Sequence, residues 1–341
     1  WAKWRTGVVF ASEIPALLAL PDIDRRMSPA VAHDFLAYGI VDRNEQTMLS
    51  GIKRITPGCC YEFCLEDASL CSILRYWDPG IETEDVCARD AVERIRTAFF
   101  DSVSLHLRSD VPVGVALSGG IDSTSILGAV THLGASNNVK AFSFISEDPA
   151  QSEEKWIDLA AEHYQIEVHK IRPERGDMAK DLGRLIRSQG EPFATTGMFA
   201  QARVFECASA LGIKVTLDGQ GADELLAGYP TYLAARAADL CSEMHPGLAL
   251  ATSGAIKVFA RAALMVVCPQ AESFFKEMRV SRGWNPWLSR DWFHQRGILM
   301  DAFPKLERRR DRLHDRLEQT LYDLSLPALL RYADRNSMAY S

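Results

Sequence analysis

The chain has 341 residues, of which 47% are hydrophobic and 24% are charged, a balance typical of a soluble globular protein. This length exceeds what one ordinary hydrophobic core holds, so we expect about two domains. The formal net charge of −7 argues against a nucleic-acid partner, because binding phosphate backbones requires a clustered basic surface.

The cysteines bear on metal binding and on the cellular compartment. The first four, Cys59, Cys60, Cys64 and Cys71, lie close together, but they form no CxxC pair and no nearby histidine accompanies them. We interpret them as small apolar residues packed inside short strands rather than as metal ligands. A chain of this length with no disulfide framework fits a reducing compartment, and WAKWRTGVVF lacks a signal-peptide layout, so the sequence predicts a cytoplasmic protein.

No segment predicts a membrane partner. The longest apolar stretch, near residues 258–267, contains Arg261 and is too short to span a bilayer.

Residues 1 to about 80 are rich in turns and short strands. GVVFAS (7–12) predicts a strand, and the segment that follows, EIPALLALP (13–21), predicts a helix. A polar helix follows around residues 30–40. The Pro79–Gly80 pair is a strong turn signal, and we place a domain boundary there.

From about Asp85 onward, helices and strands alternate. A first helix at 89–107 carries an apolar face formed by Val92, Ile95, Phe99 and Val103. Strands are then predicted at 113–118, 139–145, 166–171 and 213–218, and helices at 124–134, 152–164, 178–189 and 199–212. This alternation predicts an α/β fold, a parallel sheet with helices on both faces. The chain from Thr231 onward has a mostly helical pattern.

The turn ALSGGIDSTS (116–125) leaves the first of these strands. Ligands of parallel sheets bind beyond the carboxyl ends of the strands. Gly119 and Gly120 would let the backbone approach an anion, and the next helix would bring free N–H groups to the same place. Asp122 suits such a site if it holds Mg²⁺ that bridges phosphate oxygens. The alternative is an ordinary strand–helix turn with an aspartate cap; neither GxxxxGK[ST] nor GxGxxG is present.

A second turn, LDGQGADELLAGY (217–229), also leaves a strand. Its two glycines precede Asp223 and Glu224, which open a new helix. Without the first turn, we would interpret these acids as ordinary residues at a helix N-terminus, where negative charge interacts favourably with the helix dipole. Two acid-bearing glycine turns on neighbouring strands instead predict a clamp for magnesium pyrophosphate.

These turns, with several other segments, resemble one enzyme group. SGGIDS resembles the pyrophosphate loop of the N-type ATP pyrophosphatases (PP-loop enzymes), and the wider pattern is similar to that of the glutamine-using, class B asparagine synthetases. The matching segments are VFASEIPALL (9–18), GIKRITPG (51–58), RYWDP (75–79), LRSDVPVGVALSGGIDS (107–123), GEPF (190–193), LDGQGADELLAGY (217–229) and LPALLRYADRNSMAYS (326–341). The resemblance implies a Rossmann-like PP-loop domain at 81–341, preceded at 1–80 by the C-terminal part of a type 2 glutamine amidotransferase domain.

The resemblance also implies which residues hold ATP. The backbone of Ala116 and Leu117 would contact adenosine, and Ile145 would pack against adenine. The pyrophosphate loop would consist of Ser118, Gly119, Gly120, Asp122 and Ser123.

The same resemblance places the metal and the acceptor substrate. Asp122 and Asp223 would bind Mg²⁺, so ATP and Mg²⁺ are the expected cofactors. Glu191, Gly219 and Gln220 would lie at the acceptor, with Gln220 counted among the catalytic residues beside the two aspartates.

The implied reaction is asparagine synthesis. A carboxylate, aspartate by resemblance, would attack the α-phosphorus of ATP to form an acyl-adenylate, and ammonia from glutamine would displace AMP. The expected partners are thus a small-molecule carboxylate and glutamine, with a homodimer left open.

Three departures from the family pattern keep alternatives open. The chain begins at Trp1 and lacks the N-terminal glutaminase cysteine, which favours a fragment. Gln220 stands where asparagine-forming members have glutamate and cannot take a proton. The chain also stops at Ser341, before an expected acid, arginine and lysine. The alternatives are amidation of a sugar uronate or secondary metabolite, intramolecular amide formation as in lasso-peptide or β-lactam-forming relatives, and a nucleotide-binding protein without turnover.

Overall fold

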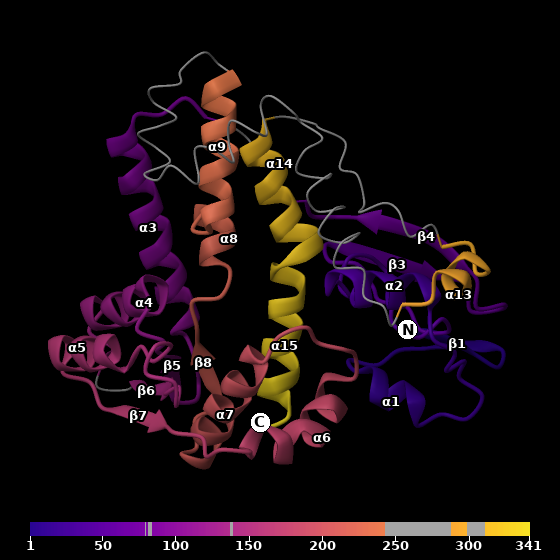
Figure 1. The fold of residues 1–341 in the computed structure, drawn as a ribbon, viewed down its shortest axis with the longest axis horizontal. Coiled ribbons are helices and arrows are strands. Elements are labelled where there is room, and N and C mark those ends of the chain that lie inside the picture. Colours follow the sequence, from indigo (N-terminus) through magenta and orange to yellow (C-terminus); the bar gives the residue numbers. More distant parts are fainter. Residues whose placement is uncertain (79, 81–83, 137–138, 243–287, 299–310) are drawn as a thin grey trace. The chain divides into compact units, whose positions relative to one another are not determined.

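The computed structural model describes residues 1–78, 80, 84–136, 139–242, 288–298 and 311–341 (Figure 1). The chain divides into two compact units. The first unit comprises Trp1–Ile81, Gly190–Ala194 and Gly221–Leu329, and the second unit comprises Glu82–Gln189, Thr195–Gln220 and Leu330–Ser341. These units are defined by contacts, and the domain assignment made from motifs stays a prediction.

The second unit is built on a parallel sheet, as the sequence predicts. In its described residues the sheet has four strands in the order β7-β6-β5-β8, and every neighbouring pair is parallel. The strands are β5 (Val113–Ala116), β6 (Val139–Phe144), β7 (Val168–Ile171) and β8 (Val215–Leu217). Since β5 lies between β6 and β8, the turns after β5 and β8 leave the same edge side by side.

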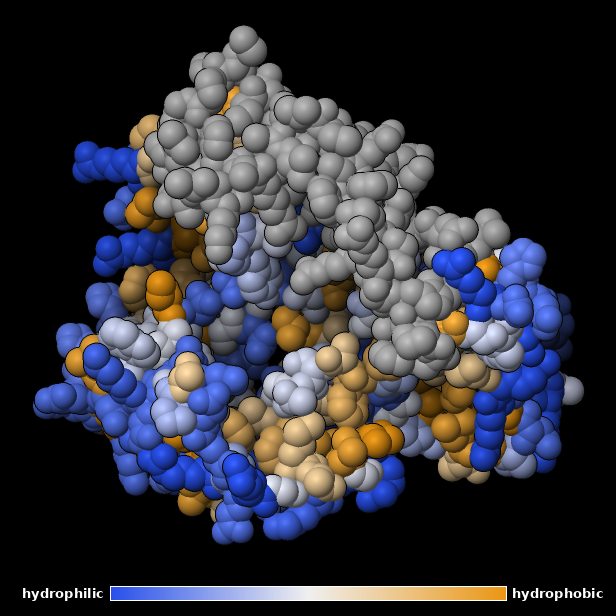
Figure 2. Space-filling model, viewed as in Figure 1, coloured by the Kyte–Doolittle hydropathy of each residue, from blue (hydrophilic) through white to orange (hydrophobic). Residues whose placement is uncertain are grey.

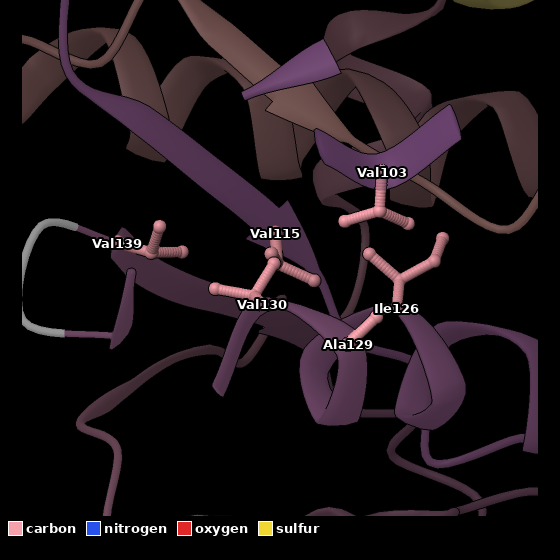
Figure 3. Close-up of a cluster of buried hydrophobic side chains, with 6 residues drawn as sticks. All are labelled: Val103, Val115, Ile126, Ala129, Val130 and Val139. Carbon is pink, nitrogen blue, oxygen red and sulfur yellow. The ribbon is translucent and has the colours of Figure 1, made fainter. Parts of the chain in front are cut away.

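Helices cover both faces of this sheet. The helices of the second unit are α3 (Ala88–His106), α4 (Ile121–His132), α5 (Glu154–Tyr164), α6 (Asp177–Gln189), α7 (Gly197–Ala210) and the end of α15 (Leu326–Met338). One face packs on α3 and α4 through the cluster in Figure 3: Val103, Val115, Ile126, Ala129, Val130 and Val139. On the opposite face Phe142 of β6 packs against Val204 and Ala208 of α7. The predicted α/β fold is confirmed.

The predicted apolar face of α3 is only half buried. Val103 is buried and Phe99 packs against the same cluster, but Val92 and Ile95 are 61% and 51% exposed. Only the last turns of α3 pack against α4. The helix was therefore predicted correctly, but the prediction that the first half of its apolar face is buried was wrong.

The first unit begins with two antiparallel hairpins separated by short helices. Its early elements are β1 (Ala2–Trp4), β2 (Gly7–Val9), α1 (Ile14–Leu18), α2 (Pro29–Tyr38), β3 (Cys59–Phe63) and β4 (Leu70–Arg75). Ala2, Leu17, Ile23 and Ile52 form a buried cluster among them. The strand and two helices predicted in this segment are therefore present.

The later part of the first unit is helical where it is described. It contains α8 (Ala222–Leu226), α9 (Pro230–Ser242), α13 (Arg290–His294), α14 (Arg312–Gln319), a π-helical turn (Thr320–Leu324) and the start of α15. The rest of the helical prediction, and the apolar stretch at 258–267, lie outside the described residues. None of the helices in the described part of the chain combines enough length and hydropathy to span a bilayer.

The prediction that the first four cysteines pack inside is wrong. Cys60 and Cys71 are exposed, and Cys59 and Cys64 are only partly buried. All four lie in or beside the strands of the β3–β4 hairpin as predicted, but a two-stranded hairpin buries at most one face.

Candidate active site

Hydroxyl hydrogen bonds shape the turn after β5. The buried Ser123 side chain accepts a hydrogen bond from the Ser118 backbone N–H at 3.1 Å, and the two serine Oγ atoms lie 3.0 Å apart. The Gly120 N–H donates to Ser118 Oγ at 3.3 Å. These bonds bend the chain back at the N-terminus of α4, where the helix leaves backbone N–H groups for an outside acceptor.

Gly119 occupies a crowded place in this turn, where a larger residue would be strained. Its φ is +84°, and a Cβ atom there would lie 3.1 Å from Trp156 Cβ and 3.2 Å from the Glu153 carbonyl oxygen. The left-handed backbone and the close approach to the start of α5 therefore favour glycine at this position.

The turn after β8 touches the first turn. A Cβ atom on Gly219 would lie 2.9 Å from Asp122 Cβ and 3.2 Å from the Ser123 nitrogen. The two glycine turns thus form one continuous edge in the second unit, with Asp122 partly buried beside it and Gln220 exposed. Sequence reasoning predicted both turns on neighbouring strands, and the pairing of β5 with β8 brings them together.

Asp218 is a residue of this edge that sequence reasoning missed. It directly follows β8, and its Oδ1 atom accepts a hydrogen bond from the Gln220 N–H at 3.1 Å. Burial raises the pKa of its carboxyl group, and the Gln220 bond only partly opposes this. An acid at the carboxyl end of a strand was the available signal, but Asp218 was counted as the strand's last residue.

The residues assigned to adenosine lie at the ends of β5 and β6. Leu117 is buried; its N–H donates to the Phe142 carbonyl at 2.8 Å, and its carbonyl accepts from Ser143 Oγ at 2.7 Å. Ile145 is 3% exposed and packs in the cluster that contains Leu117. Their contacts with a nucleotide, and that of Ala116, stay predictions.

Asp223 and Glu224 lie on α8 of the first unit. Glu224 is buried, and its Oε1 atom accepts hydrogen bonds from Tyr229 Oη at 2.7 Å and Ser325 Oγ at 2.6 Å. Burial and the bond to Glu224 raise the pKa of Tyr229. This network fixes the helix that carries Asp223. Because Asp122 belongs to the second unit, the predicted meeting of Asp122 and Asp223 stays a prediction.

Glu191 is held within the first unit. Its Oε2 atom accepts from the Arg54 guanidinium, and its Oε1 atom accepts from the Met48 N–H at 2.9 Å. Arg54 also pairs with Asp42 at 3.1 Å. Both oxygens of Glu191 thus anchor residues 190–194, and its predicted contact with the acceptor substrate stays a prediction.

The donor set at the edge of the second unit suits magnesium. Among the described residues, no three His, Cys, Asp or Glu side chains gather as a metal site. Mg²⁺ does not need such a group, because it commonly binds one or two carboxylates together with substrate phosphates and water. Asp122, beside the glycine edge, fits that requirement.

The comparisons with known proteins agree with this geometry. Residues 94–341 match the family model for asparagine synthase, which is more than half of the chain. The chain belongs to the asparagine synthase family. The resemblance inferred from the motifs is confirmed.

Several curated proteins are similar in sequence to the chain. Amidase chyE of Penicillium rubens is 28% identical over 243 residues, covering 65% of this chain and 35% of the relative. Glutamine-hydrolysing asparagine synthetase 3 of Bacillus subtilis is 27% identical over 246 residues, covering 68% and 39%. Asparagine synthetase B of Escherichia coli is 34% identical over 158 residues, covering 40% and 26%. The chain thus spans well under half the length of these relatives.

Proposed function

We propose that this protein is an ATP-dependent ligase that converts a carboxylate into an amide and releases AMP and pyrophosphate. The observation that carries the proposal is the contact of Gly219 with Asp122 and Ser123, which joins two glycine turns at the carboxyl edge of a parallel sheet. Membership of the asparagine synthase family supports the same reaction class.

The chain's residues would act by positioning and charge neutralisation. The backbone and hydroxyl groups of residues 118–123 would cradle the β- and γ-phosphates of ATP. A carboxylate oxygen of the acceptor then attacks the α-phosphorus, and the pyrophosphate leaves in line. Mg²⁺, held by Asp122 and Asp223, would supply positive charge to the leaving pyrophosphate. Ammonia next attacks the acyl carbon, and AMP leaves.

Aspartate and glutamine are the proposed acceptor and ammonia source. Relatives named as glutamine-hydrolysing asparagine synthetases support this choice. Residues 1–80 would then be the C-terminal part of a glutaminase domain, and the protein would act in the cytoplasm.

A second candidate is amidation of another carboxylate, such as a uronate, a secondary metabolite or an amine-bearing acid that cyclises on itself. The observation that favours it is Gln220 in the second turn, where asparagine-forming enzymes carry glutamate. Two relatives named as amidases fit this candidate loosely.

The test is ATP–pyrophosphate exchange by the full-length protein with different carboxylic acids. Exchange that depends on L-aspartate supports asparagine synthesis, and exchange with another acid only supports the second candidate. An Asp122→Asn variant should lose exchange in either case. Absence of exchange with every acid, in a folded protein that binds ATP, would overturn the ligase function.

A further inference from the structure

Asp218 lies at the reacting edge but has no part in the reaction as proposed so far. Val115 of β5 pairs with Leu217 of β8, so the next register position sets Asp218 beside Ala116, where the first glycine turn begins. Its carboxyl group is turned toward Gln220 by the 3.1 Å hydrogen bond from the Gln220 N–H. Asp218 therefore belongs to the turn whose next residue, Gly219, lies directly against Asp122.

The surroundings of Asp218 contain little positive charge. In the described part of the chain the structure gives it no basic partner. The titratable residues nearest to it along the two turns are Asp122 in the first turn of α4 and the exposed Lys214 before β8, and β5 carries none. Asp223 and Glu224, both acidic, follow along the chain in α8, and the other titratable residue of α4, His132, lies in its last turn. Partial burial without a counter-ion makes the carboxylate a better base than a surface aspartate.

The amination step requires a base. When the nitrogen of ammonia bonds to the acyl carbon it becomes positively charged and must lose a proton for the amide to form. Gln220 cannot accept that proton, because its amide is not basic. Asp122 is assigned to Mg²⁺ in the proposed function.

We propose that Asp218 is the proton acceptor of the amination step, on the basis of its place in the turn shared by Gly219 and Gln220. This inference rests on the proposed ligase function. The new C–N bond forms as the bond between the acyl carbon and the AMP oxygen breaks, and AMP leaves with that electron pair. One N–H proton passes to the Asp218 carboxylate and then to water, so acyl-adenylate and ammonia give amide, AMP and one proton.

The experiment separates the two half-reactions in the full-length protein. Ammonium chloride replaces glutamine, and the free ammonia concentration is kept constant as the pH is varied. In Asp218→Asn, ATP–pyrophosphate exchange should stay within about twofold of wild type, while amide formation should fall by about 10²- to 10⁴-fold, the usual contribution of a general base. In wild type, the rate of amide formation should fall at acidic pH as Asp218 becomes protonated, and this fall should be absent in Asp218→Asn.

A rescue variant and a stability measurement distinguish this role from a structural one. Asp218→Asn/Gln220→Glu restores a carboxylate to the same turn and should recover part of the amide formation. The melting temperature of Asp218→Asn should equal or exceed that of wild type, because the substitution removes a partly buried charge. An equal loss of exchange and amide formation, or a raised KM for ATP, would make Asp218 a nucleotide ligand and overturn the inference. If wild type shows no exchange, the ligase function itself falls.

Discussion

Gly219 lies directly against Asp122, since a Cβ atom on the glycine would be 2.9 Å from the Cβ atom of the aspartate. A Gly219→Ala variant must therefore shift the two turns apart. We expect it to lower ATP–pyrophosphate exchange on the order of 100-fold, the cost of misplacing reacting groups by about 1 Å.

Gly183→Ala is the matched control for this substitution. Gly183 lies in α6 of the same unit, and its nearest neighbour is the flexible end of Arg187 at 3.6 Å. Alanine there should stabilise the helix by about 0.5–1 kcal/mol and leave exchange unchanged. Equal exchange rates in the two variants would show that the contact between the turns is not needed.

Asn336 joins the end of α15 to α6 and α7 within the second unit. Its amide accepts from Gln189 Nε2 at 3.0 Å and donates to the Met198 carbonyl and to Gln201 Oε1, each at 3.0 Å. Asn336→Ala should destabilise the protein by about 1–3 kcal/mol for each buried polar group left without a partner. Urea unfolding would measure this loss. The control is Ser337→Ala, which should be nearly neutral because the Ser337 hydroxyl donates only to the Asp334 carbonyl at an exposed site. Similar midpoints for both variants would contradict the prediction.

Arg54 holds two largely buried carboxylates, Asp42 and Glu191, in the first unit. Arg54→Met would leave both without their shared cation, and we expect a loss of about 3–5 kcal/mol, as for other broken buried pairs. The adjacent Lys53 pairs with Glu45 at the surface, where such a bridge contributes only about 0–1 kcal/mol. Lys53→Met is therefore the control, and equal shifts in thermal unfolding for the two variants would refute the difference.

Glu154 makes the stability of the second unit sensitive to acid. Hydrogen bonds from Arg172 and Lys170 lower the pKa of its carboxyl group from the ordinary 4.5 to about 2. Because the carboxyl group has a lower pKa in the folded than in the unfolded protein, its ion pairs stabilise the fold fully at pH values above 4.5. This stabilisation is lost as the pH falls from 4.5 toward 2. Figure 2 shows mainly hydrophilic residues over α5 and β7, where these pairs lie.

Glu154→Gln should therefore lose less stability than wild type across that acid range. Melting temperatures recorded between neutral pH and pH 2, as in other linkage measurements, test this. Glu153→Gln, at the exposed preceding residue, should follow the wild-type curve. A Glu154→Gln curve parallel to wild type would mean that the ion pairs do not form in solution.

The sequence predicted the parts of the fold that local patterns encode. The four strands of the second unit, the helices between them and both glycine turns follow from hydrophobic period and turn residues. The pairing of β5 with β8, which joins Gly219 to Asp122, could be expected only from the general geometry of parallel sheets.

Burial and side-chain partners could not be predicted in the same way. Val92 and Ile95 share a helical face with the buried Val103 yet are exposed, because burial depends on what packs against each turn. Arg54 meets Glu191 across 137 positions of sequence, and no local signal connects them. Asp218 was missed because the sequence pattern makes it the last residue of a strand, and the burial that raises the pKa of its carboxyl group depends on the surrounding fold.

The two units are interleaved along the chain, which crosses between them after residues 81, 189, 194, 220 and 329. During synthesis on a ribosome, the β1–β2 and β3–β4 hairpins are made long before their unit is complete, because that unit also needs residues up to 329. Because neither unit is one continuous segment of the chain, no single cut in the chain separates the two. Truncating the chain at any one of these crossings would therefore leave at least one of the two units incomplete.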